Sequence, residues 1–485
     1  MNPILVITVI SLYFILLMVI SHLTSKSADN LTFFTANKQS PWYLVAFGMI
    51  GASLSGVTFI SVPGEVGNTA FSYFQVVLGY LVGYFVIAAV LLPLYYRLNL
   101  ISIYTYLEQR FGTRSYKTGA FFFLLSRIVG SAFRLFLVAG VLQIAIFDAF
   151  KWPFSITVAV TIALIWLYTF RGGIKTIVWT DTLQTLFMIS AVVISIYLMK
   201  DGLDMSWTSL SEKVSNSGYS KIFVWDWQSG KNFFKQFVSG AFIAIVMTGL
   251  DQDMMQKNLT CRTLKDAQKN MFWFCIVLVI VNFLFLSMGA LLYVYAEQMQ
   301  ITLPQKSDDL YPMLALQHFP AVAGVVFLLG IVAAAYSSAD SALTALTTSF
   351  CVDFLGLGKE EKPISKKLRI RVHLGFSVIL FAVILIFKAI NDDSVITAVF
   401  TAAGYTYGPI LGLFTFGLIT KYSLKDKYVP IVCLLSPVLS YIININSEAW
   451  LNGYKFGFEI LVVNGLLTFI GLFLLKEKNE NYKAL

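Results

Sequence analysis

The stretch Gly48-Met-Ile-Gly-Ala-Ser-Leu-Ser-Gly-Val-Thr58 places glycines and hydroxylated residues inside a long apolar segment. A second stretch of this kind reads Ala333-Ala-Ala-Tyr-Ser-Ser-Ala-Asp-Ser341. Small residues let helices pack closely in a membrane. A cluster of hydroxyls beside an aspartate also offers several oxygen ligands to a hard cation, and glycine permits a helix break that frees carbonyl oxygens. The two stretches therefore predict either a close helix contact or a cation site within a membrane.

The composition places both stretches in a lipid bilayer. Of the 485 residues, 58% are hydrophobic and 13% are charged, whereas soluble domains carry about 25% charged residues. The net charge of +9 comes from short loops between apolar segments. This placement is typical of membrane topology signals and argues against a nucleic-acid surface. The first apolar run lacks a basic leader and a cleavage site, so we expect a retained span and not a signal peptide.

About thirteen segments are apolar enough to cross a membrane, since a span needs about 20 residues. Loops rich in Lys and Arg alternate with loops that are acidic or nearly neutral. The positive-inside rule then predicts an extracellular N-terminus and a cytoplasmic C-terminus in a multi-pass protein of the cell membrane. The predicted spans centre near residues 12, 55, 85, 133, 161, 189, 243, 283, 335, 379, 405, 436 and 465.

Four ionisable residues lie inside these spans, where they are costly and therefore candidates for function. Arg127 and Arg134 share one face of the fourth span, Asp181 opens the sixth, and Asp340 lies in the ninth. Arg127 could extend to the membrane interface, whereas the mid-span position of Arg134 favours a functional or paired role. The segment Gly404-Tyr-Thr-Tyr-Gly-Pro409 interrupts the eleventh span. Because proline loosens a helix, this segment predicts a kink or hinge, or else only a packing notch.

The strongest motif reads Arg171-Gly-Gly-Ile-Lys-Thr-Ile-Val-Trp-Thr-Asp-Thr-Leu-Gln184. It resembles the signature of the sodium/solute symporter family, which includes carriers of sugars, proline, pantothenate, iodide and sialic acid. Tyr106-Leu-Glu-Gln-Arg-Phe-Gly112 is similar to the loop after the family's second core helix. Asp251-Gln-Asp-Met-Met-Gln-Lys257, with Lys265-Asp-Ala-Gln268, is similar to the loop after its sixth core helix.

The resemblance implies an all-α integral membrane protein with the inverted-repeat fold of the leucine transporter type. The chain then forms a single transporter domain, in which residues 1–25 are an extra N-terminal helix. Residues 42–200 form the first repeat, residues 233–420 the inverted second repeat, and residues 428–476 two C-terminal helices. The first and sixth core helices are expected to be broken near the middle of the membrane.

The resemblance also implies the ion sites. The family's common sodium site corresponds to the carbonyl oxygens of Gly51, Leu54 and Ala334 with the hydroxyls of Ser337 and Ser338. We expect sodium to join the first and eighth core helices, both of them broken. A second cation site, similar to one in the sialic acid branch, corresponds to Asp181, Asp340 and Ser341, with one of the two neighbouring serines shared. Asp340 stands where that pattern has a serine, so a proton could replace sodium there.

For the substrate, Ser55-Gly-Val-Thr-Phe-Ile-Ser-Val-Pro63 resembles the sialic acid branch. The resemblance implies that Ser53, Ser55 and Thr58 face the ligand, with Gln75 on the next helix. The arginine that binds carboxylate in that branch falls at Gly130, and Arg127 and Arg134 lie one turn to either side. Both arginines are therefore candidates for a carboxylate-bearing substrate such as sialic acid or another organic acid. A neutral solute (a sugar, amino acid or vitamin) is the alternative.

The sequence thus favours sodium-coupled symport of a small organic solute into the cell by alternating access. A channel is disfavoured because no filter-like motif repeats, and a sensor because the tail after Lys476 is short. An enzyme is disfavoured because His22, His318 and His373 form no catalytic constellation with the four cysteines. We expect sodium as the coupling ion and no other metal or cofactor. The expected partners are the solute, sodium and the lipid bilayer, without nucleic acid or an obligatory protein partner.

Overall fold

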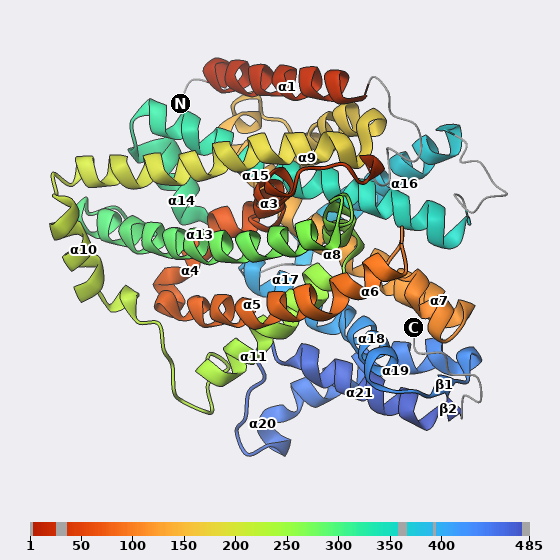
Figure 1. The fold of residues 1–485 in the computed structure, drawn as a ribbon. Coiled ribbons are helices and arrows are strands. Elements are labelled where there is room, and N and C mark those ends of the chain that lie inside the picture. Colours follow the sequence, from red (N-terminus) through yellow and green to blue (C-terminus); the bar gives the residue numbers. More distant parts are fainter. Residues whose placement is uncertain (1–2, 26–35, 357–365, 391–393, 478–485) are drawn as a thin grey trace.

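The chain folds into a bundle of helices that run roughly along one common direction (Figure 1). The computed structural model describes residues 3–25, 36–356, 366–390 and 394–477. Within these ranges the only strands are β1 (Ser423–Leu424) and β2 (Lys476–Glu477), which pair antiparallel with Ser423 opposite Glu477 and Leu424 opposite Lys476. The predicted all-α class is confirmed. The basic residues Lys26, Lys359 and Lys362, which contribute to the predicted topology, lie outside the described residues.

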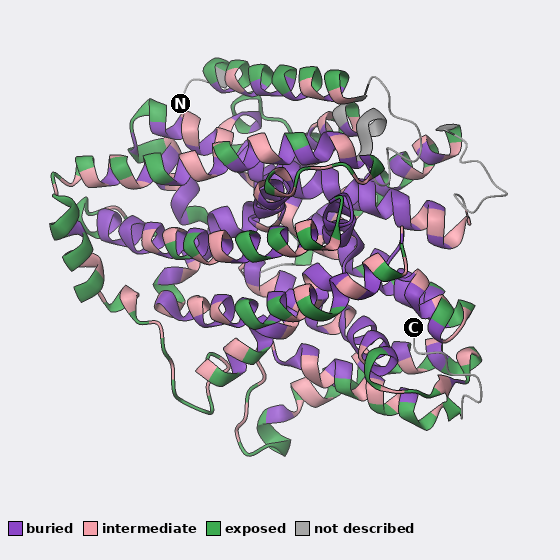
Figure 2. Cartoon of the chain, viewed as in Figure 1, coloured by how far each residue is buried: buried purple, intermediate pink, exposed green. Residues whose placement is uncertain are grey.

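Helix α1 (Pro3–Ser25) lies along the upper edge of the bundle in Figure 1 and packs against α9. Its inward face buries Tyr13 and Leu17, while Ile4, Leu12 and Ile15 are exposed on the other face. Large exposed apolar side chains also cover α16, α19 and α21. In a bilayer these faces contact lipid, which explains why the outer helices in Figure 2 are green or pink on one side and purple on the other.

The first predicted broken helix is confirmed. Residues 54 and 55 separate two short helices: Leu54 has ψ 74° and Ser55 is extended with ψ 179°. Glycine and serine around this point lower the cost of leaving the helix. The elements of this part are α3 (Trp42–Ser53), α4 (Gly56–Thr69), α5 (Phe74–Val86), α6 (Leu92–Arg97), α7 (Thr105–Arg110), α8 (Thr113–Ala145) and α9 (Phe154–Gly202).

Helix α9 joins two predicted spans. Its apolar stretches are Phe154–Leu167 and Ile174–Gly202, which match the predicted centres near 161 and 189. We expected a loop at Arg171, but the backbone is helical throughout this segment. The side chains of residue 168 and of residues 170–173 lie outside the described part of the chain.

The second predicted broken helix is also confirmed, in a different form from the first. Helix α11 continues as a π-helical turn from Ile245 to Gly249 and then bends by 69° into α12. Asp251 caps α12 by accepting hydrogen bonds from the backbone N–H groups of Asp253 and Met254. We expected Asp251–Lys257 to be a loop after the sixth core helix, and this was wrong, since these residues form the second half of that helix.

Two further predictions concern the eleventh and the ninth predicted spans. Helices α17 and α18 meet at Tyr407 with a bend of 47°, which confirms the kink predicted from Pro409. The expectation that the ninth span, the eighth core helix, is broken was wrong, because α15 is one unbroken helix. The elements are α10 (Trp207–Asn216), α11 (Phe233–Ala244), α12 (Gln252–Asn258), α13 (Leu264–Gln298), α14 (Leu310–Met313), α15 (Ala321–Ser349), α16 (Lys366–Ile390), α17 (Val395–Thr406) and α18 (Gly408–Ile419).

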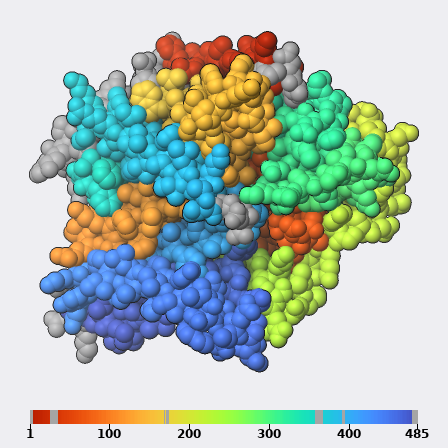
Figure 3. Space-filling model, turned by 180° about the vertical axis from the view of Figure 1, so that it is seen from behind, coloured from red at the N-terminus to blue at the C-terminus, as the bar shows by residue number. Residues whose placement is uncertain are grey.

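The C-terminal helices form a layer along the lower edge of the molecule, seen in blue in Figure 3. This layer contains α19 (Val429–Ile445), α20 (Ser447–Trp450) and α21 (Ile460–Leu474). Helix α21 packs closely on α18, and Asn464 donates hydrogen bonds to the carbonyls of Gly404 and Tyr405. The amide of Asn464 therefore satisfies backbone groups near the α17–α18 bend.

In the described residues, eight helices are long and apolar enough to cross a membrane, or ten when each bent pair counts as one span. Three shorter apolar helices are α3, the first part of α9, and α21. All thirteen predicted centres fall within or between these helices. The number of spans and the orientation of the termini remain predictions.

Helices α5 and α11 approach each other closely. A Cβ atom on Gly240 of α11 would lie 2.0 Å from the carbonyl oxygen of Val76, and one on Gly79 of α5 would lie 2.1 Å from that of Phe237. No side chain fits between backbones at this distance. Glycine at both positions therefore fixes the contact between α5 and α11.

Candidate functional site

The break in α3–α4 lies against α15 at the predicted sodium site. The hydroxyl of Ser338 is 3.5 Å from the carbonyl oxygen of Ala52, which lies between Gly51 and Leu54. Helix α3 in turn rests on α9: a Cβ on Gly51 would lie 2.2 Å from the hydroxyl oxygen of Thr185, so only glycine fits. Ala334 is buried one turn before Ser338 on α15. The structure thus brings the two predicted stretches together at the break.

The same region contains a buried carboxylate. Ser337 donates a hydrogen bond of 2.7 Å to one carboxylate oxygen of Asp181. The other oxygen forms an ion pair with Lys257 of α12, at 2.7 Å. Asp340 is buried and accepts a hydrogen bond of 3.3 Å from Ser341. The predicted second-ion residues therefore share one region, but Asp181 already has a cationic partner that the sequence did not reveal.

Arg127 belongs to a buried network between α8, α12 and the α17–α18 bend. Its guanidinium forms an ion pair with Asp253 and lies 3.8 Å from Asp251. The hydroxyl of Tyr407 donates a 2.6 Å hydrogen bond to Asp251. The positive charge of Arg127 is therefore compensated within the protein, even though its side chain reaches the wall of the central cavity.

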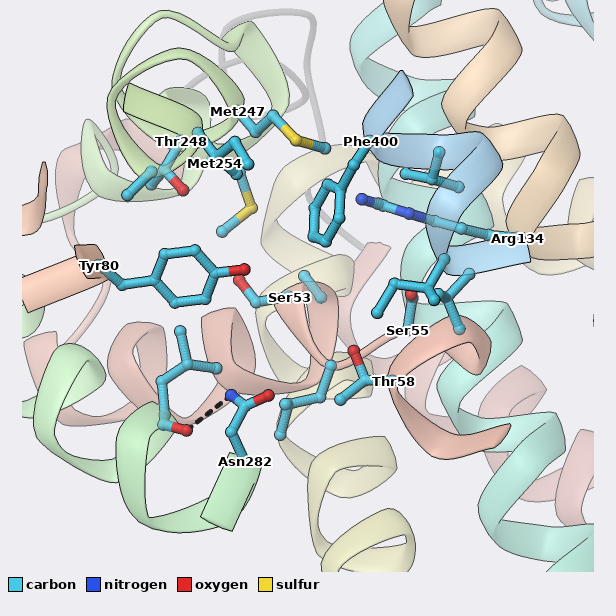
Figure 4. Close-up of a pocket in the computed structure, with 18 of the residues that line it drawn as sticks. Ser53, Ser55, Thr58, Tyr80, Arg134, Met247, Thr248, Met254, Asn282 and Phe400 are labelled. Carbon is cyan, nitrogen blue, oxygen red and sulfur yellow. Dashed lines mark hydrogen bonds between the residues drawn. The ribbon is translucent and has the colours of Figure 1, made fainter. Parts of the chain in front are cut away.

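Arg134, two turns further along α8, has a different environment. Its Nε is buried without a hydrogen-bond partner, and among the described residues the guanidinium forms no ion pair. Figure 4 shows the side chain extending toward Phe400 at one side of the central cavity. Arg134 as a whole is half-buried. A guanidinium without an ion pair is costly inside a membrane-spanning bundle, and a bound anion would satisfy it. Arg134 is therefore the arginine available to a ligand.

The central cavity encloses about 720 Å³ of space, part of it open to solvent. Helices α3, α4, α5, α8, α11, α13 and α17 contribute to its wall, together with the π-helical turn before α12. In Figure 4, Ser53, Ser55 and Thr58 lie at the helix break, and the hydroxyl of Tyr80 points toward Ser53. A cavity between helices with a few converging polar groups is the usual form of a small-molecule site.

Five of the six predicted substrate residues line this cavity: Ser53, Ser55, Thr58, Arg127 and Arg134. Gln75 does not. Its amide nitrogen donates to the carbonyls of Ser72 and Lys231, and its amide oxygen accepts from the backbone N–H of Val224. The prediction that Gln75 faces the ligand does not fit this geometry, because its polar atoms hold the segment before α11 against α5.

The sequence did not single out several residues of the wall. Asn282 of α13 donates its amide to the carbonyl of Leu278 (Figure 4), which leaves its amide oxygen as an acceptor for a ligand. A lone asparagine in the apolar run from 276 to 286 was the signal for this position. Other residues of the wall that the sequence did not single out include Tyr73, Tyr80, Tyr84, Met247, Thr248, Met254 and Phe400.

Comparison with known proteins agrees with this geometry. The profile of the sodium:solute symporter family matches residues 33–423. The sodium/sialic acid symporter NanT of Aliivibrio fischeri is 25% identical over 464 residues, which cover 91% of this chain and 88% of that protein. The sodium/sialic acid symporter SiaT of Proteus mirabilis is 25% identical over 421 residues, with 82% and 80% covered.

Solved structures show the same fold. A Na⁺-coupled sialic acid symporter, in a substrate-bound outward-open state, superposes with a TM-score of 0.82 at 19% identity and covers 98% of this chain and 99% of that one. Mhp1, a transporter of the nucleobase-cation-symport-1 family, superposes with a TM-score of 0.54 at 15% identity, with 90% and 92% covered.

The chain therefore belongs to the sodium:solute symporter family. It is a multi-pass membrane protein with the inverted-repeat fold of the leucine transporter type, and it carries out sodium-coupled symport by alternating access. The family and these relatives are transporters and not enzymes.

Proposed function

We propose that the transported solute is a small organic acid and that Arg134 binds its carboxylate. The single observation that carries this proposal is that the guanidinium of Arg134 lies at the cavity wall and forms no ion pair among the described residues. A carboxylate accepts two parallel hydrogen bonds from a guanidinium, and such charge-assisted bonds are among the strongest in proteins. Arg127 lies at the same cavity but is already paired with Asp253.

The polar groups at the other side of the cavity suit the rest of such a solute. Ser55 and Thr58 belong to the helix break, and Asn282 offers its amide oxygen. Relatives of this chain include sodium/sialic acid symporters and a sodium-coupled monocarboxylate transporter, and both kinds of substrate carry a carboxylate. A sialic acid or a smaller organic acid therefore fits this proposal.

We also propose that the coupling sodium binds between α3 and α15. The carbonyl oxygens of Gly51, Leu54 and Ala334 and the hydroxyls of Ser337 and Ser338 supply five oxygen ligands. Ser338 contacts the carbonyl of Ala52, and Ser337 donates its proton to Asp181, which leaves its oxygen lone pairs free for a cation. A hard cation prefers such oxygen ligands.

Sodium is expected to bind first and to hold the end of α3 against α15, which orders Ser53 and Ser55 at the cavity. The ion can shift the equilibrium between outward and inward states only through its different affinity for them. For a neutral solute and one sodium, a tenfold gradient supplies about 1.4 kcal/mol and a potential of about 100 mV supplies about 2.3 kcal/mol. Coupled transport can therefore concentrate the solute.

Uptake of radiolabelled solutes by proteoliposomes, with and without an inward sodium gradient, tests the proposal. The panel contains sialic acid, small monocarboxylates, and neutral sugars and amino acids. We expect uptake of at least one acid to need sodium and to be lost in Arg134→Gln. Sodium-driven uptake of neutral solutes only, unchanged in that variant, would instead establish the neutral-solute alternative.

A further inference from the structure

Lys257 places an ammonium group in the region where a second sodium is expected. Its Nζ lies 2.7 Å from one carboxylate oxygen of Asp181. The two side chains are 1% and 0% exposed, so solvent does not separate or screen them. Because Lys257 lies in α12 and Asp181 in α9, the pair also joins the second half of the bent helix to the helix beneath the sodium site.

Both oxygens of the Asp181 carboxylate already have partners. One bonds Lys257 and the other accepts the hydroxyl of Ser337, each at 2.7 Å. The side chain of Ser337 is itself one of the proposed sodium ligands. The carboxylate therefore lies next to the first cation site, and its own positive partner is supplied by the chain.

An ammonium group and a sodium ion can bind at the same kind of site beside a carboxylate. Each is a compact unit charge that binds several oxygen atoms. Two such charges bound to one buried carboxylate repel each other strongly, because little water screens them and the carboxylate compensates only one of them. The position beside Asp181 therefore accommodates Lys257 or a second sodium, and not both.

We propose that the ammonium of Lys257 is a tethered cation that takes the place of the second sodium, so that the transporter moves one sodium ion per solute. Unlike an ion, the ammonium is not released, and it keeps Asp181 neutralised throughout the transport cycle. Asp340 and Ser341 remain nearby on α15 and can serve as further oxygen ligands if the ammonium is removed.

This stoichiometry sets the driving force. If the solute is a monoanion, which rests on the function proposed above, one sodium makes the cycle electroneutral. A tenfold sodium gradient then supports accumulation of about tenfold, and the membrane potential adds nothing. Two sodium ions would support about 100-fold from the same gradient and would make uptake respond to the potential.

The test counts sodium per solute in proteoliposomes, by simultaneous uptake of ²²Na⁺ and labelled solute at potentials set with potassium and valinomycin. We expect a ratio of 1 and a sodium Hill coefficient near 1 for the wild type and for Lys257→Arg, which keeps the charge. In Lys257→Gln, Asp181 is freed, and we expect the Hill coefficient to rise toward 2. In the double variant Asp181→Asn/Lys257→Gln, both charges are gone and the ratio should return to 1.

A wild-type ratio of 2 would overturn the inference, whatever the variants do. So would a folded Lys257→Gln protein that transports with an unchanged Hill coefficient. If Lys257→Gln does not fold, the wild type, Lys257→Arg and the double variant decide the question. A ratio of 1 with electrogenic uptake would support the tethered cation and contradict the anionic solute, so the two proposals fail separately.

Discussion

Arg127 of α8 forms a buried ion pair with Asp253 of α12, whereas Arg134 on the same helix forms no ion pair among the described residues. The two arginines are seven residues apart, which corresponds to about two helical turns. One guanidinium therefore holds the bundle together and the other is free for a ligand. Substitutions of the two arginines should have different consequences.

Replacement of Arg134 by glutamine should impair transport without unfolding the protein. A charge-assisted hydrogen bond contributes about 1.5–3 kcal/mol, so we expect the apparent affinity for an acid to fall by about 10- to 100-fold. Uptake kinetics and the thermal unfolding midpoint in detergent measure both effects. Normal transport of the acid by this variant would contradict the role of Arg134.

Replacement of Arg127 by glutamine should instead destabilise the fold. It leaves Asp253 buried without its cation, and breaking a buried pair typically costs about 3–5 kcal/mol. We expect a lower unfolding midpoint, with partial recovery in Arg127→Gln/Asp253→Asn, because the second change removes the unpaired charge. A midpoint equal to that of the wild type would show that this pair is not structural.

Replacement of Gln75 by leucine should lower stability without affecting solute binding, because Gln75 does not line the cavity. Its amide bonds the backbone at Lys231 and Val224, and those partly buried groups lose their partners in the variant. We expect a loss of stability of about 1–3 kcal/mol with KM for the solute unchanged. An increase in KM without any change in the unfolding midpoint would contradict this structural role and would indicate that Gln75 contacts the solute.

The contact between α5 and α11 should tolerate no side chain at Gly240. The Cβ atom of Gly240→Ala would meet the backbone of Val76 at 2.0 Å, so the helices must separate, and overpacking of this kind costs about 1–3 kcal/mol. Gly140→Ala in α8 is the matched control, because its Cβ would have nothing within 4 Å. Equal unfolding midpoints for the two variants would contradict the close contact.

The sequence predicted the positions of the apolar helices and the two stretches that meet at the proposed sodium site, because composition and helix-breaking residues are local properties. It missed α12, since the polar residues between Asp251 and Lys257 resemble a loop when their burial is unknown. The family resemblance led us to expect a break in α15, but the small residues there allow an unbroken helix to pack on α9.

The sequence could not predict the two buried ion pairs, for a different reason. Lys257 and Asp181 are 76 residues apart, and Arg127 and Asp253 are 126 apart. Only the tertiary fold brings the members of each pair together. Gln75 was misplaced because a family resemblance gives a position along a helix, whereas the direction of a side chain depends on the neighbouring loop.

The most direct test of the sodium site is uptake by the double variant Ser337→Ala/Ser338→Ala in proteoliposomes with an inward sodium gradient. The two substitutions remove both hydroxyl ligands from α15 while they preserve its helix. We expect the purified variant to remain folded and to lose sodium-driven uptake, whereas the wild type accumulates the solute. Undiminished accumulation by the variant would contradict a cation site between α3 and α15.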